Sequence, residues 1–154
     1  MGVFDYVHIH IPLPEGFEQY QDDDYQTKDF DEMHMRELHV APDGQIYVRE
    51  WDLRDLTDEE ILQHKEQYAG TIFADFPPMM TRLDTYVDYL LEDVHQDVRC
   101  LNREDHDGRI EVTIRFTNGV VQSVKAQKFA KGEYRKPPIQ EASYTFPLNK
   151  SIET

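Results

Sequence analysis

Two histidines near the N-terminus have the clearest chemical spacing in the chain. His8 and His10 alternate with apolar residues in the segment DYVHIHI, so a strand would place both imidazoles on one face of a sheet. Imidazoles bind zinc when further ligands converge with them. The residues that could complete such a set are His34, His39, Asp5 and Glu32. Because zinc-binding cysteines are absent and the histidine spacing is weak, we expect no tightly bound zinc and no cofactor, with both histidines solvated.

A second candidate is a row of carboxylates four residues apart, formed by Asp84, Asp88 and Glu92. On a helix this spacing places successive carboxylates about 6 Å apart along the axis. Phosphates along a nucleic-acid strand have a comparable spacing, so the row could bind a basic partner by imitating a nucleic-acid backbone. The alternative is an ordinary solvated helix face, in which each like-charged pair costs about 0.2–0.5 kcal/mol.

A run of three acids, Asp22, Asp23 and Asp24, lies within the polar stretch 18–31, which we expect to be a surface loop. These carboxylates could contact a basic partner or calcium. They lack the ligand series of an EF-hand loop. The alternative is that they are solvated loop residues.

Charge is distributed unevenly along the 154 residues, whose net charge is −15. Residues 1–107 contain 27 of the 31 acidic residues and 8 of the 16 basic ones. Such asymmetry indicates a charged partner, and the acidic excess disfavours direct contact with nucleic acid or anionic membrane. A basic stretch could bind phosphate groups, or could neutralise acids of the same or a second copy. Its members are Lys125, Lys128, Lys131, Arg135 and Lys136.

Sequence motifs give no support to an enzyme. The chain has no P-loop, no G-x-G-x-x-G, no G-x-S-x-G and no H-E-x-x-H. Cys100 is the single cysteine and falls at the end of an apolar helical seam, so we expect it to be buried, in a reducing cytoplasm. The sequence has neither an apolar run of transmembrane length nor a signal-peptide pattern.

Periodicity predicts one α+β domain over residues 1–154, with an antiparallel sheet built from hairpins and one long and one short helix. Strands are expected over 5–11, 32–40, 46–52 and 141–148, with a turn at Pro42-Asp43-Gly44. Thr57 and Glu60 form a capping box that should begin a short helix ending near Tyr68. The long helix is expected over 80–98, where apolar residues recur at helical spacing.

The hairpin over 109–129 is the clearest long-range prediction, because two alternating runs flank Thr117-Asn118-Gly119. A two-residue Asn-Gly loop would pair Phe116 with Val121 but put Lys125 opposite Val112. A three-residue loop with a left-handed Gly119 would pair Phe116 with Val120. This second register keeps one face apolar, so we prefer it.

Three segments carry a resemblance to a known group of proteins. They are MGVFDYVHIHIPLPEG, YQTKDFD and RFTNGVVQSVKA. The chain resembles small proteins encoded by tailed phages and prophages, which begin Met-Gly-x-Phe-Asp, carry a Gln-Thr-Lys-Asp-like segment and end in a strand–turn–strand. The resemblance covers the first 31 residues and roughly 109–126. Some of those proteins have Cys-x-x-Cys pairs near the N-terminus, suggesting zinc, where this chain has His8 and His10. The resemblance implies a phage protein acting in a bacterial cytoplasm, without implying an activity.

These features favour a non-enzymatic phage protein that binds a basic host protein through an acidic surface. The expected target is a nucleic-acid-binding or defence factor, contacted through Asp84, Asp88, Glu92 and Asp22–Asp24. One alternative is an assembly accessory protein that self-associates through its acidic and basic regions. Another is a metal-dependent enzyme built around His8 and His10.

Overall fold

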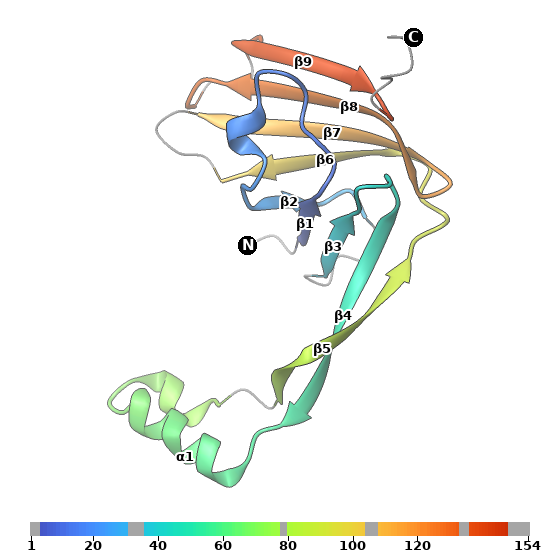
Figure 1. Ribbon diagram of the computed structural model, residues 1–154. Coiled ribbons are helices and arrows are strands. Elements are labelled where there is room, and N and C mark those ends of the chain that lie inside the picture. The colour runs from blue at the N-terminus through green and yellow to red at the C-terminus, as the bar shows by residue number, and fades with distance from the viewer. Residues whose placement is uncertain (1–3, 31–35, 78–79, 104–107, 133–135, 148–154) are drawn as a thin grey trace. The chain divides into compact units, whose positions relative to one another are not determined.

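A computed structural model of the chain describes residues 4–30, 36–77, 80–103, 108–132 and 136–147 (Figure 1). Nine strands form one sheet in the order β5-β4-β3-β1-β2-β6-β7-β8-β9. The strands are β1 (Asp5–Ile9), β2 (Tyr25–Thr27), β3 (Glu37–Val40), β4 (Ile46–Asp55), β5 (Met80–Leu90), β6 (Asp97–Asn102), β7 (Arg109–Thr117), β8 (Val120–Phe129) and β9 (Gln140–Thr145). The helical segments are α1 (Asp58–Gln67) and two 3-10 turns, η1 (Glu18–Tyr20) and η2 (Ile72–Asp75).

The architecture confirms the α+β prediction at the coarse level of an antiparallel-dominated sheet with one α-helix. Strands β1 and β3 pair in parallel, with His8 opposite His39. The pairs β1–β2, β2–β6, β3–β4, β6–β7, β7–β8 and β8–β9 are antiparallel. No helix in the described part of the chain is long and apolar enough to cross a membrane.

The chain divides into two compact units, which we describe separately. The core unit consists of Met1–Arg49 and Asp88–Thr154, and the small unit consists of Glu50–Val87. Strands β4 and β5 contribute residues to both units.

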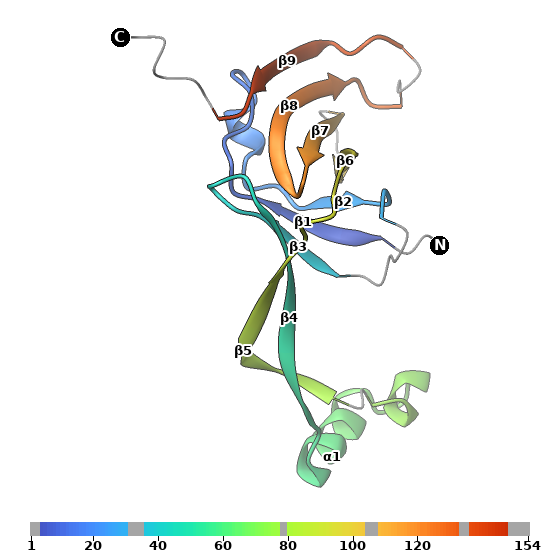
Figure 2. The same cartoon turned by 90° about the vertical axis from the view of Figure 1, so that its right-hand side faces the viewer.

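The core unit is a curled sheet that packs around a hydrophobic interior (Figure 2). Strand β7 shows how the sequence produces this, since Ile110, Val112, Ile114 and Phe116 are at most 2% exposed while the residues between them are not buried. The segment after β1 covers the interior, with Phe17 fully buried. Polar contacts tie this segment to β9: the Tyr144 hydroxyl donates to the Pro12 carbonyl, and the Gln140 amide donates to the Gly16 carbonyl.

The β7–β8 hairpin exists as predicted, but the preferred register is wrong along its length. Val112 pairs with Ala126, two residues beyond the Val124 that the three-residue loop would place opposite it. Phe116 pairs with Val121 around a two-residue Asn118-Gly119 turn, in which both residues have positive φ angles of 53° and 73°. This is the twist that a tight hairpin turn requires. A register shift between Arg115 and Phe116 then places Ile114 opposite Val124. A β-bulge therefore keeps the inner face apolar, so a longer loop is not needed.

The predicted long helix over 80–98 is wrong. Residues 80–90 form β5, residues 92–93 a turn, and β6 begins at Asp97. The apolar residues at helical spacing are thus shared between two strands and their connection. The segment is rich in β-branched and aromatic residues, which favour a strand: Thr85, Tyr86, Val87 and Tyr89. Pairing with β4 gives its backbone N–H and C=O groups hydrogen-bond partners.

The short helix is confirmed in detail. Thr57 is the N-cap of α1, its hydroxyl accepts a bond from the Glu60 amide, and the Glu60 carboxylate accepts one from the Thr57 amide. The loop predicted over 18–31 is wrong in part, because it contains η1 and β2. Tyr25 in β2 is 1% exposed, so this short strand contributes to the core. The strand predicted over 141–148 is β9, and Cys100 is fully buried as expected.

Candidate functional site

A histidine–carboxylate cluster lies on the outer face of β1 and β3, within the core unit. Alternation in β1 turns Val7 and Ile9 into the interior, so His8 points to the other side. In β3 the same alternation buries Leu38 and Val40 and leaves Glu37 and His39 on the outer face. The parallel pairing of the two strands then brings the three polar side chains together.

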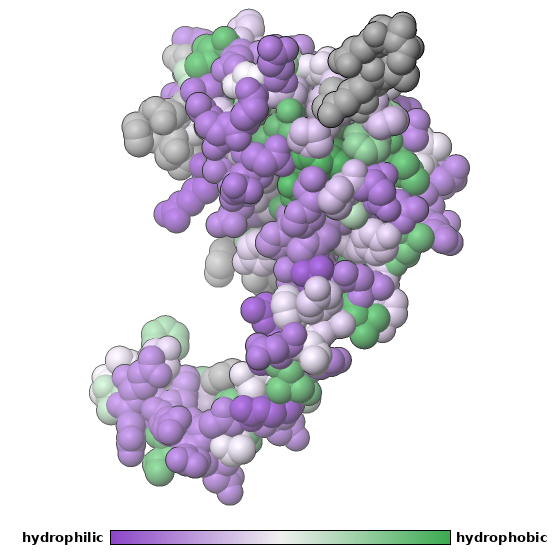
Figure 3. Space-filling model, viewed as in Figure 1, coloured by the Kyte–Doolittle hydropathy of each residue, from purple (hydrophilic) through white to green (hydrophobic). Residues whose placement is uncertain are grey.

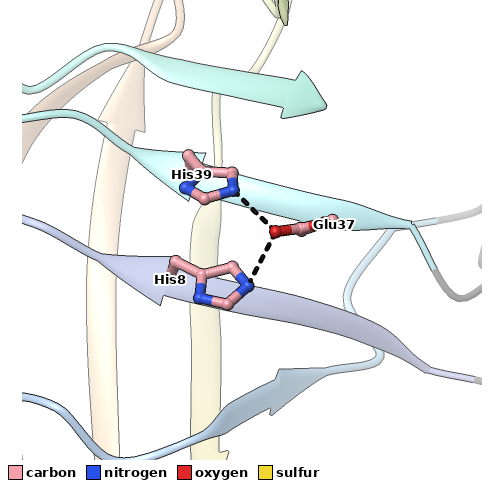
Figure 4. A group of neighbouring side chains, drawn as sticks. All are labelled: His8, Glu37 and His39. Carbon is pink, nitrogen blue, oxygen red and sulfur yellow. Dashed lines mark hydrogen bonds and ion pairs between the residues drawn. The ribbon is translucent and has the colours of Figure 1, made fainter. Parts of the chain in front are cut away.

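Both imidazoles approach one carboxylate oxygen (Figure 4). His39 Nε2 lies 3.1 Å from Glu37 Oε1, and His8 Nε2 lies 3.3 Å from the same atom. One potential ligand atom from each residue lies within 4.8 Å of the others. The side chains are 43% exposed for His8, 22% for Glu37 and 10% for His39, so the cluster opens to solvent on the His8 side.

His10 adds a second layer to the cluster. Its Nε2 lies 2.9 Å from Nδ1 of His39, so the two rings share one hydrogen bond. The ring centroids of His8 and His10 lie 4.5 and 5.2 Å from that of His39. His10 and His39 are therefore oriented by each other, whereas the His8 ring is the more exposed.

The electrostatic surroundings favour the neutral form of two of these rings. Burial lowers the pKa of His39, although the hydrogen bond to Glu37 opposes the shift. Burial also lowers the pKa of His10, with the charges of His8 and Arg49 acting in the same direction. The Arg49 guanidinium is itself paired with Asp88, through Nε–Oδ1 and Nη2–Oδ2 distances of 2.9 and 3.2 Å.

The sequence identified the histidines of this cluster but not its carboxylate. Asp5 lies on the buried face of β1, where it accepts hydrogen bonds from the backbone and side chain of Arg36. Glu32 and His34 lie outside the described residues. Glu37 was missed because its proximity to His8 depends on the parallel pairing of β1 with β3. The local signal was that Glu37 and His39 have the same two-residue spacing as His8 and His10.

Asp84, Asp88 and Glu92 do not form the predicted helical row. Asp84 and Asp88 lie on β5, and Glu92 lies in the turn that follows. Four residues along a strand span about 13 Å instead of the 6 Å of a helix, so the match to phosphate spacing is lost. Bonding to Arg49 lowers the pKa of Asp88, which therefore has a structural partner in the core unit.

The run Asp22–Asp24 lies in the connection between η1 and β2, and all three residues are exposed. Asp23 accepts a hydrogen bond from Nδ2 of the buried Asn102 at 3.0 Å. Asn102 in turn accepts a bond from the Ile110 amide. Asp23 thus has a structural role in addition to being exposed, and Asp22 and Asp24 are the other two exposed acids of this connection.

Two residues of the basic stretch, Lys125 and Lys128, contact other residues of the same molecule. Lys125 lies 3.4 Å from a Glu141 oxygen, and the Lys128 ammonium lies 5.5 Å from the Tyr20 ring centroid. Lys131 and Lys136 are exposed, and Arg135 lies outside the described residues. Neutralisation of acids in the same molecule, one of the two interpretations of this stretch, applies to Lys125.

The small unit has many exposed hydrophobic side chains, which the sequence did not predict. Among its described residues, 50–77 and 80–87, none is buried. Ten of the fourteen exposed large hydrophobic side chains of the described chain lie here, and Figure 3 shows hydrophobic surface among hydrophilic surface over this unit. They are Leu53, Leu62, Tyr68, Ile72, Phe73, Phe76, Met80, Leu83, Tyr86 and Val87.

The same unit is strongly acidic, with nine acidic residues and three basic ones. Local contacts fix its parts. Arg54 forms a two-point ion pair with Glu60, at 2.7 and 3.0 Å, and the His64 ring bonds the Phe73 carbonyl at 2.7 Å. The guanidinium of Arg82 lies 4.1 Å from the Trp51 ring centroid. These contacts stabilise the segments that carry the exposed apolar side chains, although no described residue of the unit is buried.

Comparison of the chain with protein-family models, with curated proteins and with solved structures found no match.

Proposed function

We propose that the chain is a non-enzymatic binding protein whose small unit docks on a protein with a basic surface that also offers apolar contacts. The observation that carries the proposal is the concentration of exposed large hydrophobic side chains in one acidic unit of 38 residues, Glu50–Val87. Exposed apolar patches rimmed by polar residues mark interaction sites on soluble proteins.

Hydrophobic burial supplies the affinity in this proposal. Each large side chain that passes from solvent into an interface contributes about 1.5–3 kcal/mol when fully buried. Aromatic residues are enriched at the centres of such interfaces, and the η2 region has Phe73 and Phe76 at 60% and 74% exposure. Local contacts that fix the unit beforehand reduce the entropy lost on binding.

The negative charge of the small unit determines which class of protein it can bind. The small unit has nine acidic and three basic residues, so it attracts a basic surface and repels other acidic proteins and nucleic acid. The phage origin implied by the resemblance makes a basic bacterial protein, such as a nucleic-acid-binding or defence factor in the cytoplasm, the expected partner. The acids act as a charged surface and not as an imitation of regularly spaced phosphates.

A pull-down from bacterial lysate with the full chain, quantified by mass spectrometry at low and physiological salt, tests this proposal. The matched variants are Phe76→Ser in the small unit and Ile139→Ser in the core unit, which remove side chains of 74% and 64% exposure. A basic protein should be retained by the wild type and by Ile139→Ser but not by Phe76→Ser. It should then bind directly when purified, more weakly as salt rises.

Two results would overturn the proposal. One is equal retention of the partner by both variants. The other is a molecular mass that rises with concentration in the absence of any partner and falls in Phe76→Ser. The second result would establish a further copy of the chain as the occupant and favour the assembly function.

A further inference from the structure

We propose that His8, Glu37 and His39 form a binding site for one divalent transition-metal ion of zinc-like chemistry. This goes beyond the proposed function and does not depend on it, since the cluster lies in the core unit. It also replaces the expectation, drawn from the sequence, that the histidines are solvated residues without a metal.

The distances fit a metal site. Zinc binds imidazole nitrogen and carboxylate oxygen at about 2.0–2.2 Å, which places neighbouring ligands of a tetrahedral site about 3.3–3.5 Å apart. The observed Nε2–Oε1 separations of 3.1 and 3.3 Å lie close to these values before any ion is bound. The backbone register that produces them is fixed, because β1 and β3 pair along His8–His39 and its neighbours.

His10 is a positioning residue for this site. A metal on Nε2 of His39 requires the ring's proton on Nδ1, and that atom lies 2.9 Å from Nε2 of His10. The Nδ1–H group can donate to His10, which fixes both the tautomer and the plane of the ring. Metal-bound histidines in proteins are oriented by this kind of hydrogen bond.

One ligand must turn on binding. The rings of His8 and His39 stack with planes only 14° apart, so their in-plane lone pairs run nearly parallel and do not meet. The His8 side chain is 43% exposed, and rotation about its terminal torsion is soft. Glu37 and His39 are the less exposed ligands, so two ligands are pre-placed and the third closes onto the ion.

The ligand set defines the ion. Two imidazoles and a carboxylate suit zinc and its first-row neighbours, whereas magnesium and calcium prefer oxygen ligands. Three protein ligands leave a coordination position for water or a small anion. Arg49 lies near the cluster, and its guanidinium is paired with Asp88.

Titration of chelator-treated full-length protein with Co²⁺ and Zn²⁺ tests the site. Calorimetry gives stoichiometry and affinity, and the visible spectrum of Co²⁺ reports its coordination. The variants are His8→Ala and Glu37→Gln, and the control is His64→Ala in the small unit. His39 is left intact because it is 8% exposed and its loss could disturb the fold. Circular dichroism checks that each variant remains folded.

We expect one ion per chain, with affinity reduced at least about 10-fold in His8→Ala and in Glu37→Gln and unchanged in His64→Ala. Absence of saturable binding to the wild type would overturn the site. Binding that is unchanged in both ligand variants would overturn it too.

Discussion

The two units of this chain use similar residues in opposite ways. All twenty buried hydrophobic residues of the described chain lie in the core unit, and most of its exposed large hydrophobic residues lie in the small unit. Burial of apolar surface is the main stabilising contribution in folding. The core unit therefore accounts for the stability of the protein, and the small unit retains apolar surface that a partner can cover.

The contacts that shape the small unit are ion pairs, hydrogen bonds and ring contacts between side chains that are not buried. The capping box at Thr57, the Arg54–Glu60 pair and the Arg82–Trp51 contact each join residues of this unit alone. Exposed ion pairs contribute about 0–1 kcal/mol each, and exposed cation–π contacts about 0.5–1 kcal/mol. Such contacts select a conformation but provide little cooperative stability, so the two units should respond differently to the same chemical change.

The largest expected difference comes from one phenylalanine in each unit. Phe116→Ala removes a side chain that is 1% exposed and should lower the free energy of unfolding by about 3–5 kcal/mol. Phe76→Ala removes one that is 74% exposed and should change it by less than about 0.5 kcal/mol. Chemical denaturation followed by circular dichroism measures both. A comparable loss in the two variants would show that the small unit has a core of its own.

Substitutions of two glycines with positive φ distinguish the destabilisation caused by backbone strain from that caused by steric overlap. Gly119 in the β7–β8 turn and Gly70 after α1 have positive φ angles of 73° and 84°. A Cβ on Gly119 would overlap the Leu91 carbonyl oxygen, whereas one on Gly70 would meet open space. Valine at either position incurs strain of about 1–2 kcal/mol.

We expect Gly119→Val to lower the free energy of unfolding by more than that range, because the overlap with the Leu91 carbonyl must also be relieved. It should also lower the melting temperature of the whole protein. Gly70→Val should affect only the α1 region, as seen by hydrogen exchange. Equal losses in the two variants would mean that packing around the turn is unimportant.

The parts of the fold that were predictable from the sequence are those with local causes. The capping box at Thr57 and Glu60 involves residues three apart, and the 109–129 hairpin follows from alternation around Asn118-Gly119. The bulge that corrects its register was not visible, because it depends on which face the rest of the sheet covers.

The errors have a common physical origin in long-range pairing. Apolar spacing over 80–98 fits a helix, but β4 pairs with the first part of that segment and makes it a strand. The predicted acidic row was lost with the helix, and Asp88 gained Arg49 as a partner. Glu37 entered the histidine cluster through strand pairing across about thirty residues, and its two-residue spacing from His39 does not by itself predict that pairing.

The smallest expected effect concerns pH and the small unit alone. Hydrogen bonds from Arg54 and from the Thr57 amide lower the pKa of Glu60 to about 2, compared with about 4.3 in an unfolded chain. Because the folded pKa is the lower one, the stabilisation of α1 by this carboxylate is fully present above about pH 4.3. It is lost as the pH falls from there through about 2.

Side-chain NMR should therefore show Glu60 titrating well below its ordinary range, and Arg54→Ala should move that midpoint upward. Amide protection should decrease in α1 over the same pH interval in the wild type. In Arg54→Ala the decrease should begin at higher pH, whereas protection in β7 should be the same in both proteins at each pH. A Glu60 midpoint near 4.3 in the wild type would mean that the ion pair does not persist in solution. The small unit would then lack one of the contacts that hold its apolar side chains ready for a partner.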